Sequence, residues 1–279
     1  MAGVPTLKLN DGNSIPQLGL GVWQVDPAIT ARVVRDAIAV GYRLIDTAEG
    51  YDNEQGVGEA IRTAAVPREK LFIASKLRSG AHARDAALKA FDETMDKLGL
   101  EQLDLFLIHW PVPGQDKYLE AWKTLVELRQ QARVRSIGVS NFNPDHLDRI
   151  IGETGVVPVI NQIELHPYFT QAGKRDTFRA KGMQIECYSP LGSGAVLEDA
   201  AIKAIGDKHG RSIAQIILRW HLQHGFIVIP KSTHAERMKE NIDVFGFELS
   251  PAEMKTLDGL DKGEEGRTGG NPATNNDLF

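Results

Sequence analysis

The chain has 279 residues, of which 42% are hydrophobic and 25% are charged, an ordinary globular composition. A net charge of -5 with a pI near 5.9 argues against a nucleic-acid partner, because nucleic-acid-binding domains usually carry a basic face. The single cysteine, Cys187, excludes an intramolecular disulfide and a cysteine-cluster metal site.

The N-terminus has no basic segment followed by an apolar run, and no apolar stretch reaches the roughly 20 residues that span a bilayer. We therefore expect a cytoplasmic protein with no membrane partner. Separately, we expect either a monomer or a weak homodimer. Cys187 lies in an apolar strand pattern, so we expect its thiol to be buried and unreactive.

In chain order, the first elements are two short extended runs at 7–9 and 14–18. They flank Asn10-Asp11-Gly12, and Asp-Gly between extended runs predicts a β-hairpin. Eight Val/Ile/Leu-rich runs follow and alternate with amphipathic segments, the pattern of a parallel sheet with crossover helices. These predicted strands are 18–21, 44–46, 71–76, 103–109, 135–140, 159–164, 184–188 and 226–230.

The segments between the strands are helical by periodicity, as in 84–98, where apolar residues recur at spacings of three and four. Ser212 is the predicted N-cap of a later helix, and Pro144 and Pro251 fit the first turns of two others. Eight strands alternating with helices predict one (β/α)8 TIM barrel domain over 1–279, with extra helices at 200–209 and 251–260. The glycine-rich segment 262–279 is expected to be a loose tail that folds over the barrel mouth.

Polar residues stand at the carboxyl ends of successive predicted strands, where the active sites of such barrels lie. Asp46, Lys76 and His109 end three strands, and Tyr51 follows Asp46 in the loop. Each has a structural explanation when taken alone: a turn-capping aspartate, a solvated lysine, a hydrogen-bonded histidine and a loop aromatic. The four together predict one catalytic site.

A tyrosine phenol is a poor proton donor at neutral pH unless a nearby positive charge stabilises its phenolate. Lys76 would supply that charge, Asp46 would keep Lys76 ionised, and His109 would hydrogen-bond a carbonyl oxygen. The predicted general acid, Tyr51, then needs an electron source, and the natural one is hydride from a nicotinamide cofactor.

The chain has no Gly-x-Gly-x-x-Gly element, so a dinucleotide would have to bind outside a Rossmann fold. The helix expected after the eighth strand begins with Thr233 and Glu236 at capping-box spacing. Its first amides, with Lys231, Ser232 and Arg237, would bind a phosphate. The alternative is a well-capped helix with solvated charges.

Polar and aromatic residues at the ends of three other predicted strands suit a nicotinamide ring. Tyr188 offers a flat face, and amide and hydroxyl groups that could fix the carboxamide come from Ser140, Asn141 and Gln162. The alternative is that these are buried structural polar groups.

These residues together resemble the aldo-keto reductase family over nearly the whole chain. The signatures are GYRLIDTAEGYDNE at 41–54, VRSIGVSNF at 134–142 and IPKSTHAERMKEN at 229–241. Segments 161–167 and 218–222 are similar to the short bacterial 2,5-diketo-D-gluconate reductase-like members. The resemblance implies an NADPH-dependent oxidoreductase that reduces aldehydes, ketones or diketo sugar acids to alcohols, with Tyr51 as acid/base, Lys76 and Asp46 as its tuning pair and His109 as substrate orienter.

The resemblance also implies a set of NADPH contacts, with Lys231, Ser232 and Arg237 at the 2′-phosphate. These contacts are Ser140, Asn141, Gln162, Tyr188, Ser189, Leu191, Lys231, Ser232, Thr233, Arg237, Glu240 and Asn241. His234 stands where some NADPH-specific relatives have arginine, which leaves room for some NADH use.

Departures from the family pattern concern the substrate pocket. Glu49 stands where relatives often have an apolar residue, and Arg78 where many have tryptophan. We expect Arg78 to meet anionic or hydroxylated substrates and Trp23 and Trp110 to form the apolar wall. The alternative is that Arg78 pairs with Glu49 or with solvent.

Two other classes of function are compatible with a barrel of this kind. A barrel glycosidase needs a carboxylate pair and a metal hydrolase needs a His/Asp cluster, and the strand ends provide neither, so no metal site is predicted. A nicotinamide-binding regulatory or interaction subunit with little turnover remains the alternative to a reductase.

Overall fold

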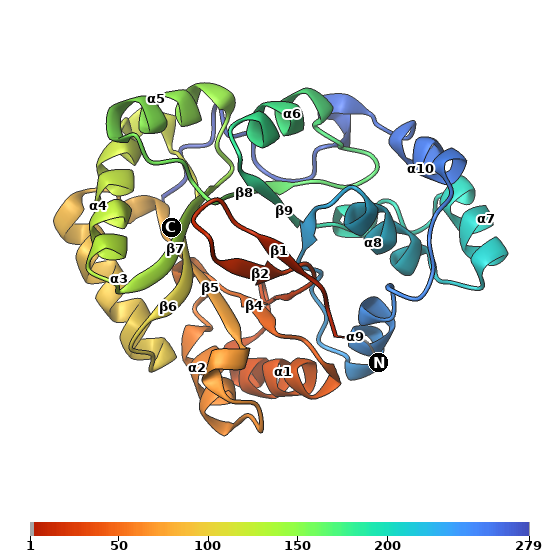
Figure 1. Cartoon of the computed structure of the whole chain (residues 1–279), viewed down its shortest axis with the longest axis horizontal. Helices are drawn as coiled ribbons and strands as arrows, with labels where there is room; N and C mark the ends of the chain where they lie inside the picture. Colours follow the sequence, from red (N-terminus) through yellow and green to blue (C-terminus); the bar gives the residue numbers. More distant parts are fainter. Residues whose placement is uncertain (1–2, 279) are drawn as a thin grey trace.

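Eight parallel strands close into a barrel, as the sequence predicts (Figure 1). The computed structural model describes residues 3–278, so Met1, Ala2 and Phe279, the ends of the expected domain, lie outside it. Neighbouring strands pair in chain order, and a parallel bridge from Leu18 to Val228 joins the last strand to the first. The strands are β3 (Leu20–Gly21), β4 (Leu44–Asp46), β5 (Phe72–Leu77), β6 (Leu103–Ile108), β7 (Val134–Ser140), β8 (Ile160–Glu164), β9 (Gln184–Tyr188) and β10 (Ile227–Val228).

A ring of helices surrounds the strands (Figure 1). The expected N-cap Ser212 and the first-turn prolines Pro144 and Pro251 occupy those positions in α8, α5 and α10. The helices are α1 (Pro27–Val40), α2 (Glu54–Thr63), α3 (Arg84–Leu98), α4 (Tyr118–Gln130), α5 (Pro144–Thr154), α6 (Ala172–Ala180), α7 (Ala200–His209), α8 (Ile213–Gln223), α9 (Ala235–Ile242) and α10 (Pro251–Asp258).

The predicted hairpin crosses one end of the barrel and forms its floor (Figure 1). Strands β1 (Thr6–Lys8) and β2 (Ser14–Pro16) pair antiparallel. The turn is tied to the barrel because Ser136 Oγ donates to Asp11 Oδ2 at 2.7 Å. The floor therefore lies at the amino ends of the strands and leaves the carboxyl ends for the site.

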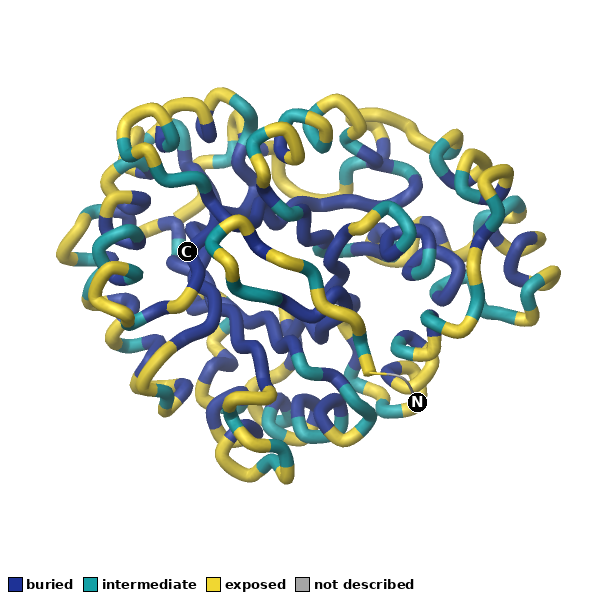
Figure 2. The backbone as a smooth tube through the Cα atoms, in the orientation of Figure 1, coloured by how far each residue is buried: buried dark blue, intermediate teal, exposed yellow. Residues whose placement is uncertain are grey.

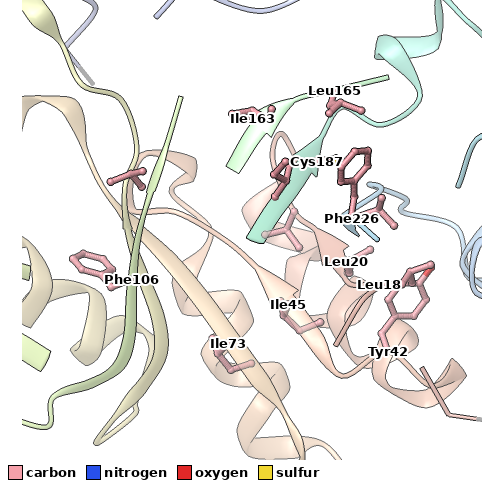
Figure 3. Packing of buried hydrophobic residues seen from close by; sticks show 14 of the residues in the cluster. Leu18, Leu20, Tyr42, Ile45, Ile73, Phe106, Ile163, Leu165, Cys187 and Phe226 are labelled. Carbon is pink, nitrogen blue, oxygen red and sulfur yellow. The ribbon is translucent and has the colours of Figure 1, made fainter. Parts of the chain in front are cut away.

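Alternation along each strand separates two apolar layers, because successive side chains point to opposite faces. One layer, between strands and helices, includes Ile45, Ile73, Phe106 and Cys187 (Figure 3). The other fills the barrel and contacts the hairpin, with members such as Leu44, Phe72, Leu105, Ile160 and Ile227. The central strands are buried while the outer faces of the helices are exposed (Figure 2). Cys187 is buried, as expected.

The same alternation decides which polar residues enter the barrel. Counting by twos from the interior residues Leu44 and Leu105 leads to Asp46 and His109, above the apolar filling. Asp46 and His109, two of the predicted site residues, therefore belong to the top layer of the barrel interior.

The segment after Lys262 is not a loose tail. Short helix η6 (Gly263–Gly266) is followed by Thr268, whose backbone N and Oγ1 donate to Glu164 Oε1 at 2.6 and 2.7 Å. Gly269 N donates to Glu164 Oε2 at 2.8 Å. A buried carboxylate at the end of β8 thus holds the segment across the mouth. In residues 3–278 no helix combines the length and apolar character needed to cross a membrane.

Candidate active site

Asp46, Tyr51, Lys76 and His109 meet at the carboxyl ends of the strands. Lys76, in β5, donates from Nζ to Asp46 Oδ1 at 2.6 Å, to the Thr47 carbonyl at 2.9 Å and to Tyr51 Oη at 3.3 Å. The rings of Tyr51 and His109 lie edge to face with centroids 5.6 Å apart. The structure therefore brings the four predicted catalytic residues into one cluster.

Burial and charge set the protonation states of Lys76 and Tyr51. Burial alone would lower the pKa of Lys76, but the Asp46 carboxylate and the Tyr51 oxygen outweigh it, and the pKa is raised. Burial raises the pKa of Tyr51, and Lys76 offsets this only in part. Lys76 is therefore a cation and Tyr51 a protonated phenol. The net upward shift at Tyr51 differs from the sequence argument, which considered the lysine charge without the cost of burying a phenolate.

His109 follows β6 and is 8% exposed. Burial, reinforced by the charge of Lys76, holds the pKa of His109 well below its ordinary value. A neutral imidazole has one N–H donor, which suits a hydrogen bond to a neutral carbonyl oxygen.

A cavity of about 720 Å³ opens above these residues, within the range of about 300–1,000 Å³ that ligand sites occupy. It is lined by Asp46, Tyr51 and His109 together with Trp23 and Trp110, the two expected wall residues. Other predicted residues also line it: Ser140, Asn141, Gln162, Tyr188, Ser189, Leu191 and Lys231.

Ser140, Asn141 and Tyr188 form a connected polar network along one wall. Asn141 Nδ2 donates to the His109 carbonyl at 3.1 Å and to Ser140 Oγ at 3.0 Å. Asn141 Oδ1 accepts from Tyr188 Oη at 2.8 Å. Asn141 is held at φ 62°, a left-handed conformation that asparagine tolerates better than most residues. The network fixes the Tyr188 ring at the edge of the cavity.

The start of α9 matches a phosphate site in part. The expected capping box is absent, because the N-cap is His234 and no described side chain caps the first turn. The amides of that turn are therefore available to an anion. Lys231 and Arg237 are exposed and form no ion pair within residues 3–278, while Ser232 is buried and bonds to His234 N at 3.1 Å.

The remaining predicted cofactor residues lie around α9. Thr233 is half-buried, Asn241 is buried, and the exposed Glu240 accepts a hydrogen bond from Ser212 Oγ. None of these side chains lines the cavity, so a cofactor that touched them would extend beyond it along the outer surface.

Arg78 and Glu49 pair with each other. Arg78 Nη1 lies 2.7 Å from Glu49 Oε1, and Arg78 N donates to Glu49 Oε2 at 3.2 Å. Glu49 is 3% exposed, and neither side chain is among those that line the cavity. This arrangement corresponds to the alternative that the sequence left open for Arg78.

The sequence pattern did not lead to two buried glutamates at this end of the barrel. Glu164 holds the C-terminal segment, and hydrogen bonds from His166, Thr268 and Gly269 lower its pKa although burial opposes ionisation. Glu186 lies inside the barrel with 0% exposure. The alternation of side chains along β9 could have identified Glu186. It stands two residues before Tyr188 and therefore points to the same face of the strand.

Comparisons with known proteins identify the family of the chain. The model of the Aldo/keto reductase family matches residues 16–262. The chain is 49% identical to an aldo-keto reductase of Mycolicibacterium smegmatis over 98% of both chains. It is 46% identical to the methylglyoxal reductase DkgA of Escherichia coli over 95% of this chain and 96% of that one. A variant of Gox0644 solved in complex with NADPH superposes with a TM-score of 0.94 at 45% identity, covering 98% of this chain and 99% of that one.

Proposed function

The chain belongs to the aldo-keto reductase family and is an NADP-dependent oxidoreductase, and we propose that it reduces small uncharged carbonyl compounds to alcohols with Tyr51 as general acid. The observation that carries this proposal is the contact of the Tyr51 phenol with the buried Lys76 cation, at 3.3 Å, at the base of the cavity.

The residues of this chain fit a nicotinamide dinucleotide. Tyr188 offers its ring, Gln162 lines the cavity beside it, and Lys231 and the uncapped start of α9 offer donors for a phosphate. When bound, NADPH supplies a hydride for the carbonyl carbon.

The protein's own part is to hold the carbonyl and deliver a proton. His109 donates a hydrogen bond to the carbonyl oxygen, and Tyr51 transfers its proton to that oxygen as negative charge develops there. Lys76 stabilises the phenolate that forms, and the Asp46 carboxylate keeps Lys76 charged. Because burial disfavours the phenolate, the positive charge of Lys76 matters most in the transition state.

The charges around the cavity favour uncharged substrates. Within the described chain, its charged lining residues are Asp46, Lys231 and Asp277. Lys231 lies at the proposed phosphate end, and Arg78 is engaged by Glu49. An anionic sugar acid would thus meet the Asp277 carboxylate without a free cation near Tyr51. The relative DkgA is named for methylglyoxal, an uncharged dicarbonyl.

The test of the proposed acid is Tyr51→Phe, assayed by NADPH oxidation with methylglyoxal and a panel of aldehydes and ketones. Loss of the proton donor should lower kcat by roughly 10²- to 10⁴-fold. NADPH affinity, measured by fluorescence titration, should stay within about threefold, since the ring is retained. Turnover by wild type that survives in Tyr51→Phe would refute Tyr51 as the acid. A wild type that binds NADPH without turnover would favour a regulatory subunit.

The test of the substrate class compares kcat/KM for methylglyoxal and for a diketo sugar acid in wild type and Arg78→Ala. We expect a preference for methylglyoxal and changes within about twofold in the variant for both compounds. A strong preference for the sugar acid that disappears in Arg78→Ala would show that Arg78 binds anionic substrates.

A further inference from the structure

Glu186 is a buried carboxyl group that the mechanism above does not use. It lies in β9, pairs in register with Gln162 of β8, and is 0% exposed. Its Oε1 has no hydrogen-bond partner among the described residues. Burial, with the charge of Asp46, raises the pKa of Glu186 to about 8. A carboxyl group in such a place is costly, and an apolar side chain would fill the same volume at lower cost.

Glu186 holds one end of the Gln162 amide. Gln162 Nε2 donates to Glu186 Oε2 at 2.8 Å and to Asp46 Oδ2 at 2.9 Å. The other Asp46 oxygen, Oδ1, is taken by Lys76. A primary amide nitrogen has two N–H donors, so these two carboxyl groups use both of them.

This arrangement fixes which way the Gln162 amide points. If the amide were reversed, its oxygen would face the Asp46 carboxylate and gain no donor. With the nitrogen held, the amide oxygen of Gln162 is the polar atom left to meet a ligand in the cavity, which Gln162 lines. Asn141 already uses both of its own N–H groups and bonds Tyr188 through its oxygen.

We propose that Glu186 is a positioning residue for the cofactor: together with Asp46 it holds the Gln162 amide so that its oxygen accepts a hydrogen bond from the nicotinamide carboxamide. This inference rests on the proposed function, because it assigns Glu186 to the nicotinamide end of that site. The neutral form of Glu186 suffices, because its carbonyl oxygen accepts from Gln162 whether or not the other oxygen carries a proton.

The test measures binding, independently of turnover, with two probes. NADPH carries the carboxamide, and 2′,5′-ADP carries the adenosine and 2′-phosphate but no nicotinamide. Glu186→Met removes the acceptor with a flexible apolar side chain of similar length. The variant should bind NADPH roughly tenfold more weakly than wild type, because the loss of about one hydrogen bond changes affinity by that factor. Its affinity for 2′,5′-ADP should stay within about twofold of wild type. Quenching of tryptophan fluorescence reports both affinities.

Glu186→Gln is the matched control, because it keeps an acceptor oxygen at the same length. It should bind NADPH within about twofold of wild type. It also keeps the proposal falsifiable if Glu186→Met does not fold, because tenfold weaker NADPH binding by Glu186→Gln would overturn the inference.

A double-mutant cycle tests whether Glu186 acts through Gln162. In a Gln162→Ala background, Glu186→Met should cause no further loss of NADPH affinity. Equal loss of NADPH and 2′,5′-ADP binding in Glu186→Met, unchanged NADPH binding in that variant, or additive effects in the cycle would each overturn the inference. If wild type binds 2′,5′-ADP but not NADPH, both the inference and the proposed function fail.

Discussion

Each end of the barrel contains a buried aspartate that pairs with at least one cation. The two clusters differ in how far the cations are exposed to water. At the floor, Asp104 accepts from Arg68 Nη2 at 2.6 Å, Arg135 Nη1 at 3.0 Å and Ile73 N at 2.9 Å. Both arginines are partly exposed, at 31% and 46%. At the mouth, Asp46 and Lys76 are nearly inaccessible.

The difference between the two clusters is one of hydration. At the floor both arginines reach solvent, so water screens the charges around Asp104 and the cluster serves stability. The mouth has one buried cation, Lys76, beside Asp46, Glu186 and the Tyr51 phenol. Because water does not solvate these buried groups, their pKa values shift from the ordinary ones. The shifted groups are Lys76, Tyr51, His109 and Glu186. The hydrated cluster at the floor supports the fold, and the buried Lys76–Asp46 pair at the mouth shifts the pKa values of the groups in the proposed site.

The largest effect should come from removing the single cation of the mouth. Lys76→Met leaves Asp46 buried without its partner and Tyr51 without a positive charge. Stability should fall by about 3–5 kcal/mol in denaturant unfolding, and kcat should fall by roughly 10²- to 10⁴-fold. The matched floor variant, Arg135→Met, should cost at most about 1 kcal/mol, because that ion pair is half exposed. Equal losses in the two variants would contradict the comparison.

Next in size is the loss of the floor carboxylate. Asp104→Asn keeps an acceptor for Ile73 N but removes the charge shared by Arg68 and Arg135. We expect the free energy of unfolding to fall by about 2 kcal/mol. The kcat/KM for methylglyoxal should stay within about twofold of wild type. A large fall in kcat/KM with unchanged stability would mean that the floor takes part in the chemistry.

Glu186 should make a smaller contribution to stability, and this contribution should depend on pH. An unfolded glutamate ionises near its ordinary value of 4.5, whereas the folded protein keeps the Glu186 proton up to about 8. The folded state therefore binds more protons in this interval, so the stability that this group contributes is full below pH 4.5 and is lost as the pH rises towards 8. In Glu186→Gln this loss is absent. The Tm of the variant relative to wild type should rise between pH 5 and pH 8, and a constant difference would argue against a buried proton at Glu186.

The smallest effect concerns the rim of the mouth. Glu164→Gln replaces one of the oxygens that hold Thr268 and Gly269 with an amide nitrogen. Weaker anchoring should raise KM for methylglyoxal by roughly threefold to tenfold, the worth of about one hydrogen bond, with little change in kcat. Trypsin should also cut faster after Lys262 and Arg267.

The control for this variant is Glu253→Gln. Glu253 is a similarly buried glutamate that bonds Lys208 and Ser250 at the start of α10, away from the cavity. It should leave KM unchanged. If both variants raised KM alike, the anchoring of the rim would not be the cause.

Much of the site was predictable because its signals are local. Asp46, Lys76 and His109 stand at the ends of apolar runs, and strands in a parallel barrel place their carboxyl ends at one mouth. Three elements have the predicted bounds: helix 84–98 and strands 44–46 and 184–188. The apolar patterns that predict them depend only on residues that are close in the chain.

What the sequence by itself determined was the order of strands and helices, the family and the four residues at the mouth. Only the tertiary structure decided which polar groups pair: Arg78 with Glu49, Glu164 with the segment after Lys262, and Glu186 with Gln162. It also decided that burial outweighs Lys76 in setting the pKa of Tyr51. The physical reason is that pairing and desolvation depend on closure of the barrel, which brings together side chains from distant strands and excludes water, and no local pattern records either.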